Sequence, residues 1–292
     1  MEIRKVPASA GAEWLLGAFR LLRTSPVGFG LLMLIYAGLW LSMALVVTAA
    51  PGAAAALQLA FFVIGPLIMA GMIYAAHEVD AGRSAAPAHL LASIHTGKAG
   101  RLITTLIPQV VVLLLCLGLL YALVGQENIE KLSALMAKLQ TQAESGKQID
   151  PNLLLDMPIG RLMLWMVLVI GIGFITLFLT LTVVPDMLFT DVRLVPAMKR
   201  SFFASLRNLP ALLVFMVLGA VLILAVAIGF GIVIGSLALI GGDTVLLVGN
   251  ALLNGFFVCF IACAMYFAWK QMLGGGGETT RAADTAPSVV AM

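Results

Sequence analysis

The sequence predicts an all-α protein: a polytopic transmembrane helical bundle with six spans and cytoplasmic amphipathic surface helices. Hydrophobic residues make up 62% of the 292 positions and charged residues only 11%, whereas soluble domains carry about 25% charged residues. Six uncharged stretches are each long enough to cross a hydrocarbon core, which takes about 20 helical residues. Lysine and arginine gather on one side of these stretches, as the positive-inside rule expects.

The six predicted spans contain no Asp, Glu, Lys, Arg or His. They cover approximately residues 27–49, 53–76, 102–124, 162–184, 211–234 and 244–269. Backbone polar groups find no water partner in lipid, so these stretches are expected to be helices. Together they predict a single transmembrane domain over residues 1–273. The glycine-rich, polar tail over residues 274–292 is expected to be a flexible cytoplasmic segment.

The orientation of the spans follows from the distribution of basic residues. Thirteen of the 17 Lys and Arg residues lie before the first span, in the second-to-third and fourth-to-fifth connections, or after the last span. The remaining four are Lys131, Lys138, Lys147 and Arg161. This asymmetry predicts that both termini lie in the cytoplasm. A cleavable signal peptide is not expected, because the first apolar stretch is far longer than the 7–15 residues of a signal core.

Two segments that precede spans resemble each other. Residues 22–26 read LRTSP before the first span, and residues 206–210 read LRNLP before the fifth. Wound as helices, both segments separate apolar from basic residues, which is typical of helices in the membrane surface plane. The predicted apolar arcs are Trp14, Leu15, Ala18, Phe19 and Leu22, and Met198, Phe202, Leu206 and Leu209. We interpret the chain as three units of one surface helix and two spans; the alternative is basic juxtamembrane helices without a repeat.

The connection between the third and fourth spans, about residues 125–160, is longer than the others. Its apolar residues recur at helical spacing: Ile129, Leu132, Leu135, Met136 and Leu139. This spacing predicts a short amphipathic helix on the outer membrane face. The helix is interpreted either as a docking element for a partner or as a lid on the protein's own outer surface.

Aromatic and proline residues mark the predicted ends and interruptions of the spans. Trp14, Trp165 and Trp269 lie near span ends, where an aromatic belt is expected at the lipid headgroups. Gly65-Pro66 is predicted to break the second span and Pro108-Gln109 the third. Half-helix ends bind ions in some transporters, but these two breaks do not fall at corresponding positions of the three units.

No residue pattern commits the chain to a reaction, so no catalytic, cofactor-binding or metal-binding residue is expected and no cofactor is predicted. The acids nearest the membrane are Asp186, which follows Pro185, and Asp243, in a glycine-rich turn. Both are expected to mark helix ends at the interface. The phosphate-binding motif G-x-x-x-x-G-K-[ST] and the hydrolase motif G-x-S-x-G do not occur.

Two groups of residues have the types that bind metals. His77, Glu78 and Asp80, followed by His89 and His95, do not match the spacing of H-E-x-x-H and are expected to be exposed loop residues. A metal or catalytic site would need His77, Asp80 and Asp186 in one cleft. Cys116, Cys259 and Cys263 are expected to pack as small apolar residues. A soft-metal site at Cys259 and Cys263 is the alternative.

Two features of the last spans bear on helix packing. Asn250 and Asn254 share a helix face and are expected to form hydrogen bonds across helices, with a polar substrate pathway as the alternative. Ala227, Gly231 and Gly235 form a stripe of small residues, which predicts close approach of another helix.

Three segments carry a resemblance to a known family. Residues 3–6 (IRKV), the helix with Trp14, Phe19 and Arg20, and residues 197–201 (AMKRS) after Pro185 resemble an uncharacterised family of bacterial multi-pass inner-membrane proteins. The last segment is also loosely similar to the membrane region of some glycerophosphodiester phosphodiesterases. No catalytic residue is carried over, because no counterpart of their hydrolase domain is seen. The resemblance implies a six-span protein of a bacterial inner membrane.

The expected function is that of an inner-membrane protein without a catalytic site. It would organise lipid or bind a membrane-protein partner through its surface helices and outer loop. A carrier or permease for an uncharged or apolar solute is the alternative, and a membrane-embedded enzyme is the third hypothesis. The net charge is only +3 and the basic residues are scattered, which argues against a nucleic-acid partner. The oligomeric state is not predicted.

Overall fold

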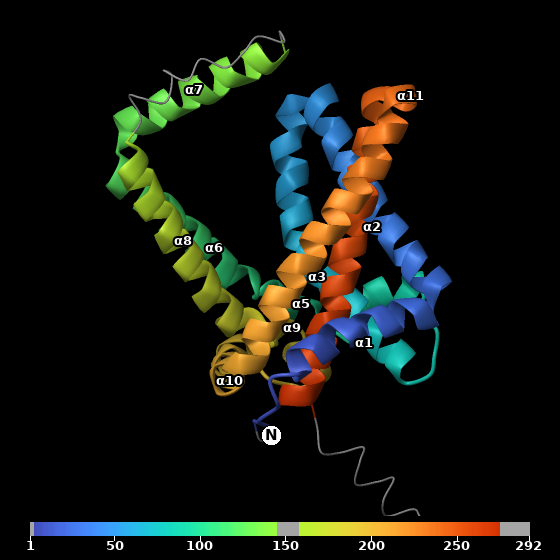
Figure 1. The fold of residues 1–292 in the computed structure, drawn as a ribbon. Coiled ribbons are helices and arrows are strands. Elements are labelled where there is room, and N and C mark those ends of the chain that lie inside the picture. Colours follow the sequence, from blue (N-terminus) through green and yellow to red (C-terminus); the bar gives the residue numbers. More distant parts are fainter. Residues whose placement is uncertain (1–2, 145–157, 275–292) are drawn as a thin grey trace, which may run out of the picture. The chain divides into compact units, whose positions relative to one another are not determined.

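The computed structural model describes residues 3–144 and 158–274, and within them the fold is all-helical (Figure 1). Five stretches are long and apolar enough to cross a membrane: Pro26–Val47, Gly52–Asp80, Ala99–Val124, Ile159–Phe189 and Leu209–Met272. Large apolar side chains on these helices are more than half exposed, among them Val111, Leu114, Val167, Val221 and Ile232. Apolar surface on this scale indicates a membrane protein.

The chain folds as two compact units. Unit 1 comprises Met1–Thr105 and Phe178–Met292, and unit 2 comprises Leu106–Leu177. The helices of unit 1 are α1 (Ala10–Thr24), α2 (Pro26–Ala49), α3 (Pro51–Asp80), η1 (Pro87–Leu91), α4 (Ala92–His95), α5 (Ala99–Ile103), α9 (Val183–Phe189), α10 (Leu194–Arg207) and α11 (Leu209–Met272). Those of unit 2 are α6 (Leu106–Val124), α7 (Gln126–Glu144) and α8 (Ile159–Thr180), whose last residues belong to unit 1. The prediction of a single domain over residues 1–273 stays a prediction.

Proline residues open three of the long helices, α2, α3 and α11. Neither of the two breaks predicted within the spans falls at its proline. Pro26 is the first residue of α2, and Pro210 lies in the first turn of α11, where a missing N–H costs no helical hydrogen bond. Pro66 lies inside α3, which continues through it. The prediction that the second span breaks there is therefore wrong, because neighbouring groups in a bundle compensate for the lost bond. In the third stretch, a turn at residues 104–105 separates α5 from α6, just before Pro108.

The helix α11 bends sharply at Gly242. The backbone there has φ 63° and ψ −155°, a conformation that glycine adopts without steric cost. On either side of the bend, Ile234 lies against Gly249: a Cβ atom on Gly249 would come within 2.7 Å of the Ile234 Cγ2 atom. The two halves of α11 therefore run back along each other (Figure 1).

The helix α1 lies across both ends of α11 (Figure 1). The Trp14 ring contacts Phe215, near the start of α11, with ring centroids 5.6 Å apart. The Trp14 indole N–H donates to the side-chain oxygen of Gln271, near the end of α11, at 2.8 Å. Gly11 also fits closely here, because a Cβ atom at Gly11 would lie 2.0 Å from the Ala211 carbonyl oxygen. Both ends of α11 are thus held at one end of unit 1.

Burial corrects one sequence prediction, which concerns aromatic residues. Trp14 is fully buried and Trp269 is 8% exposed, so the prediction that they sit in an aromatic belt at the headgroups is wrong for both. In α10, Leu206 of the predicted apolar arc is 50% exposed; that this arc lies in the membrane surface stays a prediction. The buried face consists of small residues: Ala197, Ser201, Ala204 and Ser205.

The small residues of α10 allow close contact with the end of α8. The Ser201 hydroxyl donates to the Phe178 carbonyl at 3.0 Å and accepts from the Thr182 N–H at 3.2 Å. The Ser205 hydroxyl donates to the same Phe178 carbonyl at 3.3 Å. These bonds use backbone groups that the end of α8 leaves without a helical partner. Among the large residues of α10, Val195, Phe203 and Leu206 are exposed, whereas Met198 and Phe202 are half-buried.

In unit 2, α6 and α8 are joined by a hydrogen bond from the Trp165 indole N–H to the Cys116 carbonyl at 3.0 Å. The helix predicted in the long connection is α7, in which Leu135 is buried and Met136 is 62% exposed. Whether it docks a partner stays a prediction. Residues 145–157 of this connection, and all but the first residue of the predicted tail, lie outside the described residues.

Replacing Gly11 by Ala tests the docking of α1 on α11. We expect the free energy of unfolding to fall by about 1–3 kcal/mol, the usual cost of overpacking, because the new methyl group would meet the Ala211 backbone. Titration of the purified protein with a denaturing detergent measures the change. Gly38→Ala is the matched control, since nothing lies within 4 Å of a Cβ atom there. Equal stability of the two variants would contradict the close contact.

Candidate functional site

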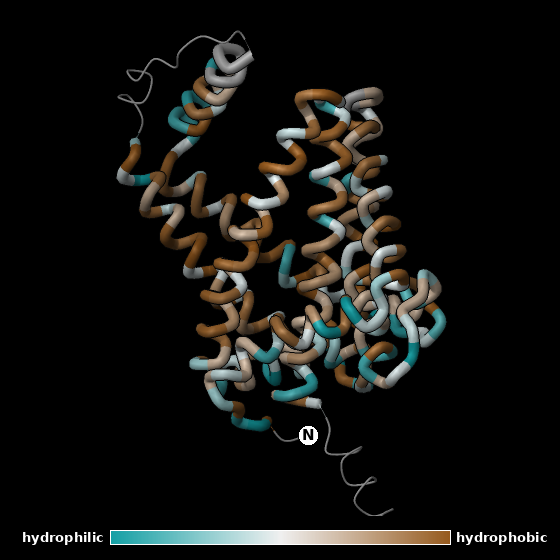
Figure 2. Tube along the Cα trace, turned by 45° about the vertical axis from the view of Figure 1, so that its right-hand side comes forward, coloured by the Kyte–Doolittle hydropathy of each residue, from teal (hydrophilic) through white to brown (hydrophobic). Residues whose placement is uncertain are grey.

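The polar residues of unit 1 gather at the end of the unit that carries the N-terminus (Figure 2). We call this region the charged end and define it as residues 3–24, 77–105, 183–208 and 266–274. The N-terminal segment and the end of α11 meet here: the Arg4 N–H donates to the Met272 carbonyl at 3.0 Å. The Asn208 side chain donates to the Arg4 carbonyl at 2.9 Å and accepts from the Val6 N–H at 2.8 Å.

Asp186, in the first turn of α9, is a fully buried carboxylate. Its Oδ2 atom lies 3.0 Å from Nη1 of Arg200 on α10, and its Oδ1 atom accepts from the Trp269 indole N–H at 3.3 Å. A buried charge is tolerated only when it is paired and hydrogen-bonded, and both conditions are met. Asp186 therefore connects α9, α10 and the end of α11.

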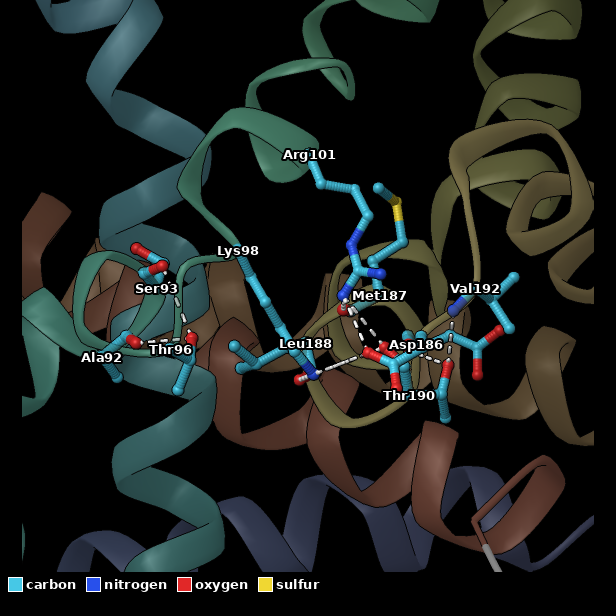
Figure 3. A network of polar contacts seen from close by, with 11 residues as sticks. Ala92, Ser93, Thr96, Lys98, Arg101, Asp186, Met187, Leu188, Thr190 and Val192 are labelled. Atoms are coloured by element: carbon cyan, nitrogen blue, oxygen red, sulfur yellow. Dashed lines mark hydrogen bonds and ion pairs between the residues drawn. The ribbon is translucent and has the colours of Figure 1, made fainter.

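Two basic side chains from the α5 region bind the carboxyl end of α9 (Figure 3). Lys98 Nζ donates to the Leu188 carbonyl at 2.7 Å, and Arg101 Nη2 donates to the carbonyls of Met187 and Thr190 at 3.1 and 3.2 Å. The last carbonyls of a helix lack partners and carry partial negative charge, so cations are favourable there. Lys98 and Arg101 therefore have a structural partner inside the chain.

A second polar cluster links α3 to the end of α11. Lys270 forms an ion pair with Asp80, and the Tyr266 hydroxyl donates to Asp80 Oδ2 at 2.8 Å. His77 Nδ1 lies 3.3 Å from the same Tyr266 hydroxyl. Because that hydroxyl donates to Asp80, His77 acts as the donor to it, which places a proton on Nδ1. This cluster also lies against Phe189, whose ring centroid is 4.9 Å from that of His77.

The expectation that His77, Glu78 and Asp80 are exposed loop residues is wrong, because all three lie in α3 and Glu78 is buried. Glu78 forms a two-bond ion pair with Arg83, at 2.5 and 2.7 Å. His89 accepts the Ala86 N–H at Nδ1, at 3.2 Å, and burial lowers the pKa of His89, which favours the neutral ring at pH 7. His95 is exposed.

The residues that a metal or catalytic site would need are not brought together. His77 and Asp80 share the Tyr266 hydroxyl, whereas Asp186 bonds to Arg200 and Trp269. Among residues 3–144 and 158–274, no group of three His, Cys, Asp or Glu side chains could hold a metal ion. That the protein is not an enzyme stays a prediction.

The two cysteines of α11 lie in the packed core of unit 1. Cys259 and Cys263 are both buried, and the Cys259 thiol contacts the Met72 sulfur at 3.7 Å. Their place among apolar neighbours agrees with packing as small apolar residues. Cys116, in unit 2, is half-buried.

The predicted packing roles of the α11 asparagines and small residues are wrong in the described structure. Asn250 and Asn254 are exposed, and their amides donate to the Leu246 and Asn250 carbonyls of their own helix, each at 2.9 Å. Each side-chain amide donates to the backbone carbonyl four residues earlier in the same helix. The amides therefore need no partner on a second helix. Gly231 and Gly235 would have nothing within 4 Å of a Cβ atom. Neither feature supports a helix contact or a polar pathway within the described residues.

Several residues that organise the charged end escaped sequence analysis. Arg200 lies 14 residues from Asp186 and on another helix, and Trp269 and Tyr266 lie 83 and 186 residues from the acids that they contact. No helical spacing connects these pairs. One available signal was the count of acids and bases at this end. Four acids at this end, Glu78, Asp80, Asp186 and Asp191, form ion pairs with cations inside the chain. Arg4, Arg20 and Arg23 are exposed and form no ion pair with the residues that the structure describes.

No protein-family model, no curated protein and no solved structure matches this chain. The resemblance to bacterial inner-membrane proteins and to the membrane region of glycerophosphodiester phosphodiesterases therefore stays a prediction.

Exchanging either partner of the Asp186–Arg200 pair is expected to destabilise the protein. Asp186→Asn should lower the free energy of unfolding by about 2–4 kcal/mol, near the cost of breaking a buried pair, since Arg200 is 24% exposed and reaches water. Arg200→Gln should cost more, because it leaves the fully buried carboxylate without a cation.

Detergent-denaturation curves of the two variants and of Asp243→Asn measure these effects. Asp243 is exposed, so its variant should stay within about 0.5 kcal/mol of the wild-type protein. An Arg200→Gln protein as stable as the Asp243→Asn control would contradict the role of the pair.

Proposed function

We propose that this chain is a six-span bacterial inner-membrane protein, with both termini in the cytoplasm, that binds anionic membrane lipid through its charged end. Its role is to organise lipid at the inner leaflet, and it carries out no reaction there. The observation that carries this proposal is the excess of exposed, unpaired arginine at the charged end.

The count of six spans is supported by the bend in α11. The five long stretches include α11, which is too long for one crossing: 64 residues would extend about 96 Å at 1.5 Å per residue. The bend at Gly242 divides it into two halves that run back along each other, each long enough for a bilayer. Six crossings place both chain ends on one side, and the Arg4–Met272 bond holds the N-terminal segment beside the end of α11.

The cytoplasmic assignment rests on charge. Thirteen of the 17 basic residues belong to the side that carries the charged end, and such an excess favours the cytoplasmic face. The cytoplasmic leaflet also carries anionic lipid, which attracts basic residues near the membrane surface. The same residues thereby set the orientation and select the lipid.

The exposed side chains of the short helices supply the apolar part of a lipid-binding surface. Leu16 on α1 is 66% exposed, and Phe203 and Leu206 on α10 are 56% and 50% exposed. Arg20, Arg23 and Arg207 are exposed on the same two helices. Apolar residues beside basic ones on a short helix are typical of contact with the headgroup layer.

Reporter fusions test the orientation. Green fluorescent protein fused after Met292 should fluoresce, and alkaline phosphatase inserted within residues 145–157 should be active, because the first reporter works in the cytoplasm and the second outside it. The reciprocal fusions are the controls and should be inactive. Phosphatase activity at the C-terminus would refute the proposed topology.

Lipid co-purification tests the binding. We expect the wild-type protein to retain phosphatidylglycerol in preference to phosphatidylethanolamine, and 1 M salt to reduce the preference by screening. The Arg23→Glu, Arg207→Glu double variant should bind phosphatidylglycerol at least about fivefold more weakly, given about 1 kcal/mol for each basic residue near a membrane surface.

Lys138→Glu is the matched control for this measurement, because Lys138 is exposed on α7, in the connection assigned to the outer face. It should leave the lipid preference unchanged. Wild-type protein that retains both lipids in proportion to their abundance would refute the proposed function.

A further inference from the structure

Three adjoining hollows along α1 share the side chain of Arg20. The largest, about 460 Å³, is lined by Leu16, Phe19, Arg20, Arg23 and Thr24. We call it the Arg20–Arg23 hollow. A second, of about 390 Å³, continues past Arg20 to Glu13 and Gln271, and a third, of about 420 Å³, extends to Arg4, Asp80 and Lys270. Arg20 therefore separates a hollow without acids from two that contain them.

The Arg20–Arg23 hollow has a charge of +2 and no acid in its lining. Neither guanidinium forms an ion pair with a residue that the structure describes, and Arg20 lies over the Phe267 ring, 5.6 Å from its centroid. The nearest acids are already engaged: Asp80 binds Lys270 and Tyr266, and Glu13 accepts from Gln271 at 3.2 Å. Two guanidinium groups that have no ion pair among the described residues line one hollow, which favours an anion with several oxygens, such as phosphate.

The other wall of this hollow is apolar and leads to the spans. Leu16 is 66% exposed. The Phe19 ring packs edge-on against Phe260 of α11 at 4.9 Å, and Phe260 stacks with Phe256 at 6.0 Å. Phe19 thus connects the wall of the hollow to buried aromatic packing on α11. A free phosphate ion makes no favourable contact with an apolar wall, whereas the glycerol and upper acyl groups of a lipid would cover it.

We propose that the Arg20–Arg23 hollow is a binding site for the phosphate of an anionic phospholipid, with the lipid's glycerol and upper acyl chain against Leu16 and Phe19. This inference rests on the proposed function, in that it places the charged end at an anionic leaflet. Arg20 and Arg23 hold the phosphate oxygens by charge-assisted hydrogen bonds. The lining of this hollow contains no acid, whereas Glu13 lines both neighbouring hollows and Asp80 lines one of them, so the phosphate is expected in the hollow without acids.

Native mass spectrometry of the detergent-solubilised protein tests the site, with phosphatidylglycerol as the anionic probe and phosphatidylethanolamine as the zwitterionic one. Arg20→Gln and Arg23→Gln should each weaken phosphatidylglycerol binding about fivefold, and the double variant by more than either. Arg20→Lys should retain part of the affinity, because the cation is kept. Lys138→Gln is the matched control: it removes an exposed cation of α7, outside the charged end, and should change the affinity less than about twofold.

A second experiment with water-soluble phosphate compounds distinguishes a lipid-binding site from a site for free phosphate. Inorganic phosphate and glycerol phosphate, at the concentration of phosphatidylglycerol that gives half-saturation, should not raise the melting temperature. Equal protection by glycerol phosphate would overturn the lipid assignment. Melting temperatures without lipid show that each variant is folded before its affinity is compared.

The outcomes also separate this site from the proposed function. If wild-type protein prefers phosphatidylglycerol but the Arg20→Gln, Arg23→Gln variant binds it equally well, the site is wrong while lipid binding through the charged end stands. If wild-type protein shows no preference, both proposals fail. A loss confined to the Arg20 and Arg23 variants supports both.

Discussion

Trp14 holds the two ends of α11 with one side chain, its ring against Phe215 and its indole N–H on Gln271. Inside lipid, apolar contact between helices provides no hydrophobic driving force, and close packing and hydrogen bonds decide association. Trp14 supplies both close packing and a hydrogen bond at the end of unit 1 where α11 begins and ends. The rest of the charged end is arranged around this contact, because it brings α1, the N-terminal segment and the last turns of α11 together.

Charge balance within the charged end explains why arginine is left over at its surface. Glu78, Asp80 and Asp186 each take a cation from inside the chain. Lys98 and Arg101 are occupied by the carbonyls of α9. Every acid buried among helices needs such a partner, since an unpaired buried charge is costly. What remains is exposed positive charge, which the anionic leaflet of a membrane is suited to neutralise.

In α10, small and polar residues rather than large apolar ones form the buried face of the helix. Its small and polar side chains, Ser201 and Ser205 among them, face the core and bind the Phe178 carbonyl. Three of its large apolar side chains, Val195, Phe203 and Leu206, are exposed. In water this arrangement would be unfavourable. It agrees with the proposed contact of α10 with the headgroup layer, where apolar side chains meet lipid.

Features of the fold that depend on neighbouring residues in the sequence could be predicted, and those that depend on distant residues could not. The all-helical fold and the long apolar stretches follow from composition and run length alone, because the bilayer imposes one conformation on any such stretch. The positions of Pro26 and Pro210 in first helical turns are equally local. The continuity of α3 through Pro66 was not predictable, since it depends on neighbours that replace a missing bond.

Only the tertiary structure decided which residues meet. Asp186 finds Arg200 and Trp269, and Asp80 finds Lys270 and Tyr266, across chain separations that carry no periodic signal. Asn250 and Asn254 turned out to bond within their own helix, because an amide four residues from a carbonyl has a partner at no cost in packing. The sequence by itself determined that lipid surrounds the long helices and that basic residues crowd one side. Which arginines stay unpaired there was settled by folding, since pairing depends on the distances that only packed helices define.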